Sequence, residues 1–149
     1  MKYQKLHAWN VGYKKAVEIQ ERLKKSIILR GSAKDCRLIA GADISYIKGS
    51  EIFYASVIVF NLQTMERVEE VTASGKVDFP YIPGLLSFRE SPILLKAFAK
   101  IKSEPDVIIL DAQGIAHPRG IGLASHIGLL LDKSAIGCAK TRLKGNTMR

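Results

Sequence analysis

The sequence predicts a single α/β domain over residues 1–149, built on a mixed β-sheet with helices on its faces. Three stretches rich in β-forming residues follow one another between positions 38 and 77 with short connections, which favours antiparallel hairpins. The apolar spacing then changes to the helical period. A continuous apolar run at 107–110 lies between two helical stretches, and a strand that precedes a helix favours a parallel crossover.

The first half of the chain contains one helical pattern and three strand patterns. Residues 13–29 carry apolar side chains at spacings of three and four, which predicts an amphipathic helix that stops before Gly31. Apolar or β-rich stretches predict strands at 38–45, 52–60 and 65–77. The third stretch is the most polar, so we place it nearer an edge of the sheet.

The second half alternates helices and strands. Ser91-Pro92 fits an N-cap followed by proline at the first helical position, which predicts a helix from there to about Ile101. The run at 107–110 predicts a strand buried on both faces, 121–131 a packed helix, and 135–139 a last short strand.

The resulting order is helix, three strands, helix, strand, helix, strand. This is the element order of the ribonuclease H-like fold, in which the first and fourth strands lie side by side and parallel, and it is one of several folds that the pattern allows.

Two aspartates accompany apolar strand patterns. Asp43 lies within the first strand and Asp111 directly follows the run at 107–110. A carboxylate there is unfavourable unless it is paired or bound to a cation. If the two strands are neighbours, Mg²⁺ relieves the repulsion between the carboxylates and can promote phosphodiester hydrolysis. The alternative is that each aspartate caps the turn beside its strand, and the residues alone leave both interpretations open.

Glu90 is a third candidate. Ser87 and Glu90 also match a capping box, but that helix start would place Pro92 inside the helix, at a cost of about 3 kcal/mol. A helix that begins at Ser91-Pro92 avoids this cost. It leaves Glu90 just before the helix, where its side chain is free to face a site.

The formal net charge of +9 favours a polyanionic partner, and nucleic acid is the commonest one. Tyr81 lies in a loop stiffened by two prolines, where an aromatic ring either stacks on bases or packs on the core. His117 is a candidate proton carrier or phosphate contact. His126 is expected to be a packed, hydrogen-bonded residue. Three residues near the end of the chain either hold phosphates or form a solvated tail: Lys140, Arg142 and Lys144.

Five segments together resemble the endonuclease V family. Residues 79–90 read FPYIPGLLSFRE and are similar to the family's PYIPGxLxFRE signature, and residues 111–119 read DAQGIAHPR and are similar to its DGxGxxHPR segment. Residues 41–45, 122–128 and 136–140 resemble further blocks, in the family's order. The resemblance implies a ribonuclease H-like fold.

It also implies a DNA-repair endonuclease that uses Mg²⁺, with Mn²⁺ as a substitute. Such an enzyme recognises deoxyinosine, the product of adenine deamination, and hydrolyses the second phosphodiester bond 3′ to the lesion. Its partner is DNA that contains deoxyinosine. Two alternatives stay open: a catalytically incomplete remnant that binds nucleic acid, and a nuclease directed at inosine-containing RNA.

The resemblance assigns five residues to the chemistry. Asp43, Glu90 and Asp111 match the metal-site carboxylates. His117 and Lys140 match polar catalytic positions near the metal and the scissile phosphate.

A second group of residues is assigned to the lesion. Tyr81 matches the residue that wedges into the DNA and helps to expose the lesion base. Pro83, Gly84 and Leu86 match the lining of a pocket for the flipped base. Ala112 stands where many members have glycine, and its methyl group is expected to crowd that pocket.

The resemblance further implies a chain that is C-terminally incomplete, because family members continue past Arg149 to a helix with another active-site aspartate. Cys36 and Cys138 have no metal-binding spacing, so we expect two unlinked thiols. No apolar run reaches the ~20 residues of a membrane-spanning helix, and no secretory signal is evident. We therefore expect a cytoplasmic protein, as a monomer.

Overall fold

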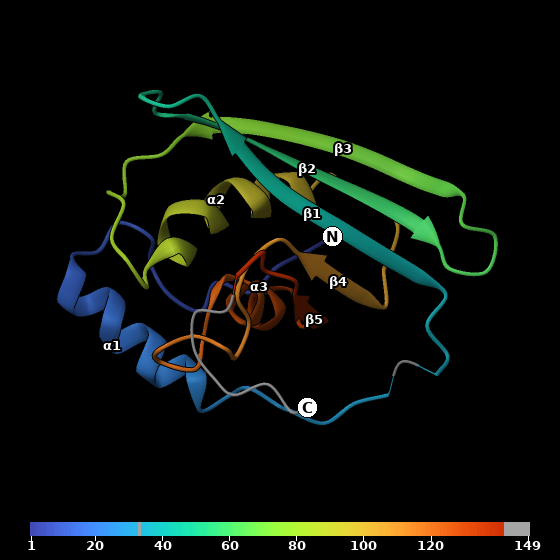
Figure 1. The fold of residues 1–149 in the computed structure, drawn as a ribbon, viewed down its shortest axis with the longest axis horizontal. Coiled ribbons are helices and arrows are strands. Elements are labelled where there is room, and N and C mark those ends of the chain that lie inside the picture. The colour runs from blue at the N-terminus through green and yellow to red at the C-terminus, as the bar shows by residue number, and fades with distance from the viewer. Residues whose placement is uncertain (33, 142–149) are drawn as a thin grey trace.

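The computed structural model describes residues 1–32 and 34–141, and this part of the chain forms a five-stranded mixed sheet with three helices (Figure 1). The strands lie in the order β3-β2-β1-β4-β5. The elements, in chain order, are α1 (Tyr13–Lys24), β1 (Leu38–Tyr46), β2 (Ile52–Asn61), β3 (Arg67–Lys76), α2 (Leu86–Phe98), β4 (Val107–Leu110), α3 (Leu123–Leu131) and β5 (Ser134–Gly137).

The strand pairing confirms the predicted topology. β1 pairs antiparallel with β2 and β2 antiparallel with β3, so the polar third strand lies at an edge. β4 lies parallel to β1, with Ala42 opposite Leu110, and parallel to β5 on its other side. The first and fourth strands are therefore neighbours, as the ribonuclease H-like order requires.

Helix α1 ends at Lys24, so the prediction that it continues to position 29 was wrong. The backbone N–H groups of Lys25, Ser26 and Ile27 each bond to the carbonyl three residues back, which tightens and closes the helix. The next two residues, Ile28 and Leu29, are 82% and 72% exposed. The apolar residues with helical spacing therefore continue along the sequence past the last residue that packs against the core.

Helix α2 begins at Leu86, so the prediction of a start at Ser91-Pro92 was wrong as well, and Pro92 lies inside the helix. The additional turn buries Phe88, which is 1% exposed, behind Leu85 at 0%. Burying an aromatic side chain offsets the hydrogen bond that proline removes. No side chain caps the helix at Leu85, so the predicted alternative, a capping box, is absent too. Helix α2 also ends three residues before the predicted Ile101, at Phe98, and the remaining predicted boundaries agree within two residues.

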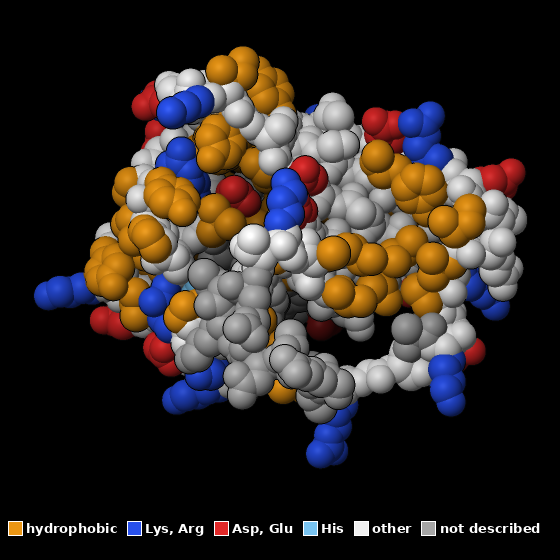
Figure 2. Space-filling model, viewed as in Figure 1, with side chains coloured by type: hydrophobic (Ala, Val, Ile, Leu, Met, Phe, Trp, Pro, Cys, Tyr) orange, Lys and Arg blue, Asp and Glu red, His pale blue; other side chains and the backbone are white. Residues whose placement is uncertain are grey.

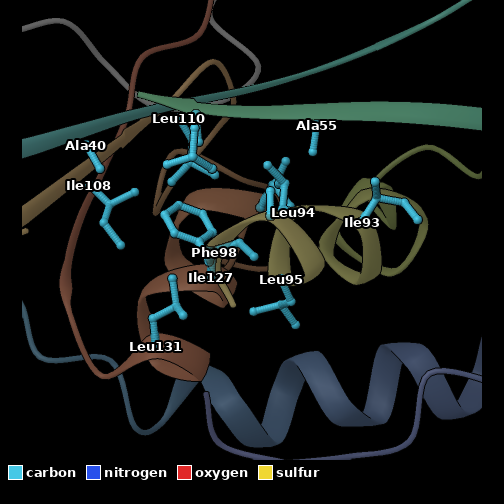
Figure 3. Packing of buried hydrophobic residues seen from close by; sticks show 14 of the residues in the cluster. Ala40, Ala55, Ile93, Leu94, Leu95, Phe98, Ile108, Leu110, Ile127 and Leu131 are labelled. Atoms are coloured by element: carbon cyan, nitrogen blue, oxygen red, sulfur yellow. The ribbon is translucent and has the colours of Figure 1, made fainter. Parts of the chain in front are cut away.

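The main core lies between one face of the sheet and helices α2 and α3 (Figure 3). Alternate residues of β1 and β2 point into it, among them Ala40, Ala55 and Val57, because successive side chains of a strand face opposite sides. Phe98 of α2 and Ile127 of α3 pack against Ile108 and Leu110 of β4 in this core. Helix α1 closes a second cluster with Leu85, Phe88 and Ile121.

The N-terminal segment, residues 1–11, packs beside α2 and α3. The Met1 amino group donates to the Phe98 carbonyl at 3.0 Å, and the Gln4 N–H donates to the Leu130 carbonyl at 2.7 Å. The Nε2 atoms of His7 and His126 share a hydrogen bond of 2.7 Å. His126 is fully buried, so the expectation of a packed, hydrogen-bonded histidine is confirmed. Burial lowers the pKa of His126 to about 3.

Cys36 and Cys138 are both free thiols, as expected. Within residues 1–32 and 34–141, no helix combines the length and the hydrophobicity that crossing a membrane requires. The expected phosphate contacts Arg142 and Lys144 lie outside the described residues.

Candidate active site

Asp43 and Asp111 lie beside the point where the parallel pairing of β1 with β4 ends. The β1–β4 pairing reaches Ala42 opposite Leu110, and each aspartate is the next residue of its chain segment. Asp43 is exposed, and its Oδ1 accepts the Ile44 N–H at 2.8 Å. Alternation along β1 turns Asp43 away from the helices, onto the outer face of the sheet.

Glu90 approaches this pair from helix α2. It is half-buried in the second turn, not ahead of the helix as predicted. Burial, followed by the negative charge of Asp43 and a smaller effect of Asp111, raises the pKa of Glu90 to about 7, although the Arg89 charge acts in the opposite direction. Carboxylates from β1, from α2 and from the segment directly after β4 therefore share one electrostatic environment.

A hollow of about 550 Å³ on the outer face of the sheet contains two of these carboxylates. We call it the acidic hollow; Figure 2 shows acidic and basic side chains near the centre of this face, between two areas of hydrophobic side chains. Lys140 lies in it, with Nζ 3.5 Å from Asp111 Oδ2 and the side chain 88% exposed. The hollow is lined by Gly41, Ala42, Asp43, Ser56, Ile58, Phe60, Ile109, Asp111, Cys138, Ala139 and Lys140.

The chemistry of this donor set fits a hard divalent cation. Carboxylate oxygens are the ligands that Mg²⁺ prefers, and Mg²⁺ is commonly held by one or two carboxylates together with waters. Within the described residues, no three side chains of histidine, cysteine, aspartate or glutamate already form one coordination shell. Asp43 and Asp111 would therefore hold the ion first, with Glu90 as the nearest further ligand.

A second pocket, of about 170 Å³, lies around Gly84, and we call it the Gly84 pocket. The expected lesion-binding residues Tyr81, Pro83, Gly84 and Leu86 all line it. Tyr81 is 68% exposed, which excludes the alternative of an aromatic ring packed on the core. The full lining is Gln20, Tyr81, Ile82, Pro83, Gly84, Leu86, Ser87, Gln113, His117, Gly122 and Leu123.

The carbonyl of Gly84 is fixed by two donors that the sequence did not reveal. Gln20 Nε2 donates to it at 3.0 Å, and Arg119 Nη2 donates to it as well, while Arg119 Nε donates to Gln20 Oε1 at 2.6 Å. Gly84 has φ of +79°, and a Cβ atom there would lie 2.6 Å from Arg119 Nη2, so only glycine fits. The sequence did contain one signal for Gln20, because it is a polar residue on the apolar face of α1. In the structure, Gln20 is 1% exposed.

His117 and Ala112 are both buried and do not line the acidic hollow. His117 lines the Gly84 pocket and not the acidic hollow, and its Nδ1 accepts the Arg119 N–H at 3.2 Å. Burial lowers the pKa of His117, and the Arg119 charge lowers it further. Ala112 is 6% exposed and packs in the main core, so its methyl group does not line the Gly84 pocket.

Glu90 is expected to make stability depend on pH. Its folded-state pKa of about 7 lies above the ordinary 4.5, so the contribution to stability is fully present below pH 4.5 and is lost as pH rises through 7. In the presence of a chelator, we expect a rise from pH 4.5 to pH 7 to lower the free energy of unfolding of the wild type by about 3 kcal/mol more than that of Glu90→Gln. Urea titrations across this range test it, and parallel pH profiles of the two proteins would contradict it.

The comparisons with known proteins agree on one family. A sequence model of the family described as Endonuclease V matches residues 21–149. Endonuclease V of Dehalococcoides mccartyi strain BAV1 is 45% identical over 145 residues, which cover 97% of this chain and 65% of that protein. Endonuclease V of Dictyoglomus turgidum is 49% identical over 134 residues, which cover 90% of this chain and 58% of that protein.

Solved structures agree with this result. The crystal structure of the Bacillus subtilis endonuclease V superposes with a TM-score of 0.90 at 32% identity, over 97% of this chain and 63% of that one. Ciona intestinalis endonuclease V, in complex with a 24-mer DNA containing an inosine followed by a ribo-adenosine, superposes with a TM-score of 0.81 at 30% identity. The match covers 88% of this chain and 58% of that one. The chain thus spans about three fifths of the length of these relatives, and its fold is ribonuclease H-like.

Proposed function

This chain belongs to the endonuclease V family, and from that premise we propose that it acts in DNA repair as a metal-dependent endonuclease for deoxyinosine. It would hydrolyse the second phosphodiester bond 3′ to the lesion. The observation that carries the proposal is the meeting of Asp43 and Asp111 where the β1–β4 pairing ends, with Glu90 close enough for their charges to add to burial in raising its pKa to about 7. A divalent cation would neutralise these carboxylates.

The residues of the acidic hollow support phosphodiester hydrolysis. Asp43 and Asp111, with Glu90 close by, would hold Mg²⁺ or Mn²⁺. Such an ion, when bound, activates water and stabilises the leaving oxygen of a phosphodiester. Lys140 extends from Asp111 into solvent, where its ammonium group is available to a phosphate oxygen.

The Gly84 pocket supports recognition of an extruded base. Its backbone is held by Gln20 and Arg119, so the pocket is formed before a ligand arrives. Gln113 and His117 add polar groups to an otherwise largely apolar lining, the composition that fixes the orientation of a small planar ligand. Extruding a base costs a few kcal/mol, and the cost is lowest where pairing is already weakened, as at a deaminated base.

The direct test is a nicking assay with the purified chain. Its substrate is duplex DNA with one deoxyinosine, with Mg²⁺, with Mn²⁺ and with chelator, beside an otherwise identical duplex with adenine at that position. A metal-dependent nick at the second bond 3′ to inosine, absent from the adenine duplex, is expected. A folded protein that produces no such nick would overturn the assignment of cleavage to this chain.

Two observations each favour a rival function, and the nicking assay can test both. The net charge of +9 fits a first rival, a protein that binds nucleic acid without cutting it. Such a protein would bind with steep salt dependence and leave every substrate intact. The DNA of the Ciona intestinalis complex carries a ribonucleotide after the inosine, so an inosine-containing RNA belongs among the substrates.

Tyr81→Ala is expected to lower the preference for inosine more than the affinity for plain DNA. The ring is 68% exposed and lines the Gly84 pocket, so its loss removes a stacking surface of about 1–3 kcal/mol without opening the core. Competition between inosine and adenine duplexes measures the ratio of the two affinities. Tyr54→Ala, a 51% exposed tyrosine of β2, is the matched control, and an unchanged ratio in Tyr81→Ala would contradict the wedge role.

A further inference from the structure

We propose that this protein has a second nucleotide-binding cavity, which holds a nucleotide of the bound DNA strand beside the lesion. The proposal rests on the proposed function in so far as the chain binds DNA. The cavity has a volume of about 530 Å³, within the usual range for small-ligand sites, and we call it the Trp9 cavity. It is lined by Trp9, Asn10, Val11, Lys76, Val77, Asp78, Phe79, Pro80, Phe88, Arg89 and Pro92.

The Trp9 cavity is separate from the two sites described above and shares no lining residue with them. The loop at 79–84 divides it from the Gly84 pocket: Phe79 and Pro80 line the cavity, whereas Tyr81 to Gly84 line the pocket. Helix α2 divides them in the same way, with Phe88 on one side and Ser87 on the other. A strand engaged by the exposed Tyr81 would therefore reach both.

Aromatic rings supply one wall of the Trp9 cavity. The Trp9 and Phe88 rings meet edge to face with centroids 5.9 Å apart, and the Phe79 and Phe88 rings lie 5.6 Å apart. Phe88 is 1% exposed and supports the other two rings, which are only half-buried. Base–aromatic stacking tolerates any sequence, because every base presents a π-face.

The polar part of the lining favours an anionic ligand. Two cations, Lys76 and Arg89, face a single acid, Asp78. Arg89 is fixed, because its Nη1 donates to the Phe79 carbonyl at 2.6 Å and its guanidinium lies 4.8 Å from the centre of the Phe53 ring. The Lys76 side chain is 58% exposed, and its ion pairs with Glu51 and Asp78 lie at the surface, so it can turn toward a phosphate.

A nucleotide uses all of these groups together, with its base on Trp9 and Phe79 and its phosphate beside Lys76. The amide of Asn10 offers a donor and an acceptor to a base edge. A purely apolar ligand would leave the cations unused, and a peptide would not require the flat aromatic wall. The net charge of +9 favours the same polyanionic ligand.

The test uses Trp9 as a reporter, because it is the only tryptophan in the chain. The wild type is titrated with a short oligothymidylate that contains no inosine, in chelator, at alkaline pH where His7 and His126 are neutral. Stacking of a base on Trp9 is expected to quench its fluorescence along a saturable curve. Thymidine monophosphate is titrated in parallel, and we expect it to bind more weakly than the strand.

Variants separate stacking from charge. By anisotropy of a labelled strand, Trp9→Ala should weaken binding on the order of 10-fold, and Trp9→Phe, which keeps the packing on Phe88, should weaken it less. Lys76→Gln should weaken binding and reduce the salt slope by about 1. The controls are Tyr3→Ala, an exposed aromatic residue of the N-terminal segment, and Lys34→Gln, an exposed lysine before β1.

The outcomes distinguish this inference from the proposed function. If inosine DNA binds and is cut, but Trp9 fluorescence is unchanged and all variants bind like the wild type, the cavity is not a nucleotide site and the function stands. If oligothymidylate quenches Trp9 while inosine DNA stays uncut, the cavity stands and the nuclease proposal fails. Monophosphate that binds as tightly as the strand would overturn the assignment to DNA.

Discussion

Replacing Asp43 with asparagine is expected to reduce metal-dependent cleavage by about 100-fold or more and to leave stability nearly unchanged. The side chain is exposed, and its hydrogen bond from the Ile44 N–H can be accepted equally by the asparagine oxygen. The substitution removes one charged ligand of a hard cation. Such a cation, when bound, supplies several kcal/mol of transition-state stabilisation. A loss of about 3 kcal/mol corresponds to a factor of about 100 in rate.

Single-turnover cleavage of inosine DNA and Mn²⁺ affinity by calorimetry measure this effect together. The matched control is Asp35→Asn, which makes the same chemical change at an exposed position of the segment before β1. The control should cut and bind Mn²⁺ like the wild type. If Asp43→Asn retained both rate and Mn²⁺ affinity, Asp43 would return to the alternative role of capping the turn beside its strand.

Phe98→Ala is expected to lower the free energy of unfolding by about 3–5 kcal/mol. Phe98 is fully buried where α2, α3 and the sheet meet, and Figure 3 shows its ring among Ile108, Leu110 and Ile127. Truncation would remove apolar contacts and leave a cavity that rigid neighbours on three sides cannot fill. A domain of this size is stable by only about 5–15 kcal/mol, so the loss takes a large share of the total.

Urea denaturation of Phe98→Ala and of Phe60→Ala measures the contrast. Phe60 is the same residue type on β2, but it is only partly buried and points to the outer face, where it lines the acidic hollow. Its truncation should therefore destabilise the protein by less than half as much. Equal losses at the two positions would show that the outer face contributes to the core as strongly as the helical face.

The sequence was sufficient to predict the sheet, and to predict that Asp43 of β1 and Asp111, directly after β4, lie close together. Apolar runs of strand length and the change of period after the third strand predicted the element order. That order made β1 and β4 neighbours, which brought Asp43 and Asp111 to one end of the sheet. The inference works because topology rules restrict how a strand, a crossover and a parallel strand can connect.

Other parts depended on tertiary packing, which local patterns do not encode. The start of α2 was wrong because a local rule about Pro92 was weighed without the buried Phe88. The end of α1 was wrong because the helical period says nothing about where the core stops. The carbonyl clamp of Gln20 on Gly84 joins residues 64 positions apart, and only the folded chain brings them together.

The parallel pairing of β1 with β4 has a consequence for the rate of folding. Asp106 Oδ2 accepts the Leu38 N–H at 3.0 Å, and the two residues lie 68 positions apart in the chain. Loop-closure entropy must be overcome before such a contact contributes any stability, so chains dominated by distant pairings cross their folding barrier slowly. Asp43 and Asp111 meet only when this pairing forms. Recovery of metal binding after dilution from urea should therefore lag behind helix formation.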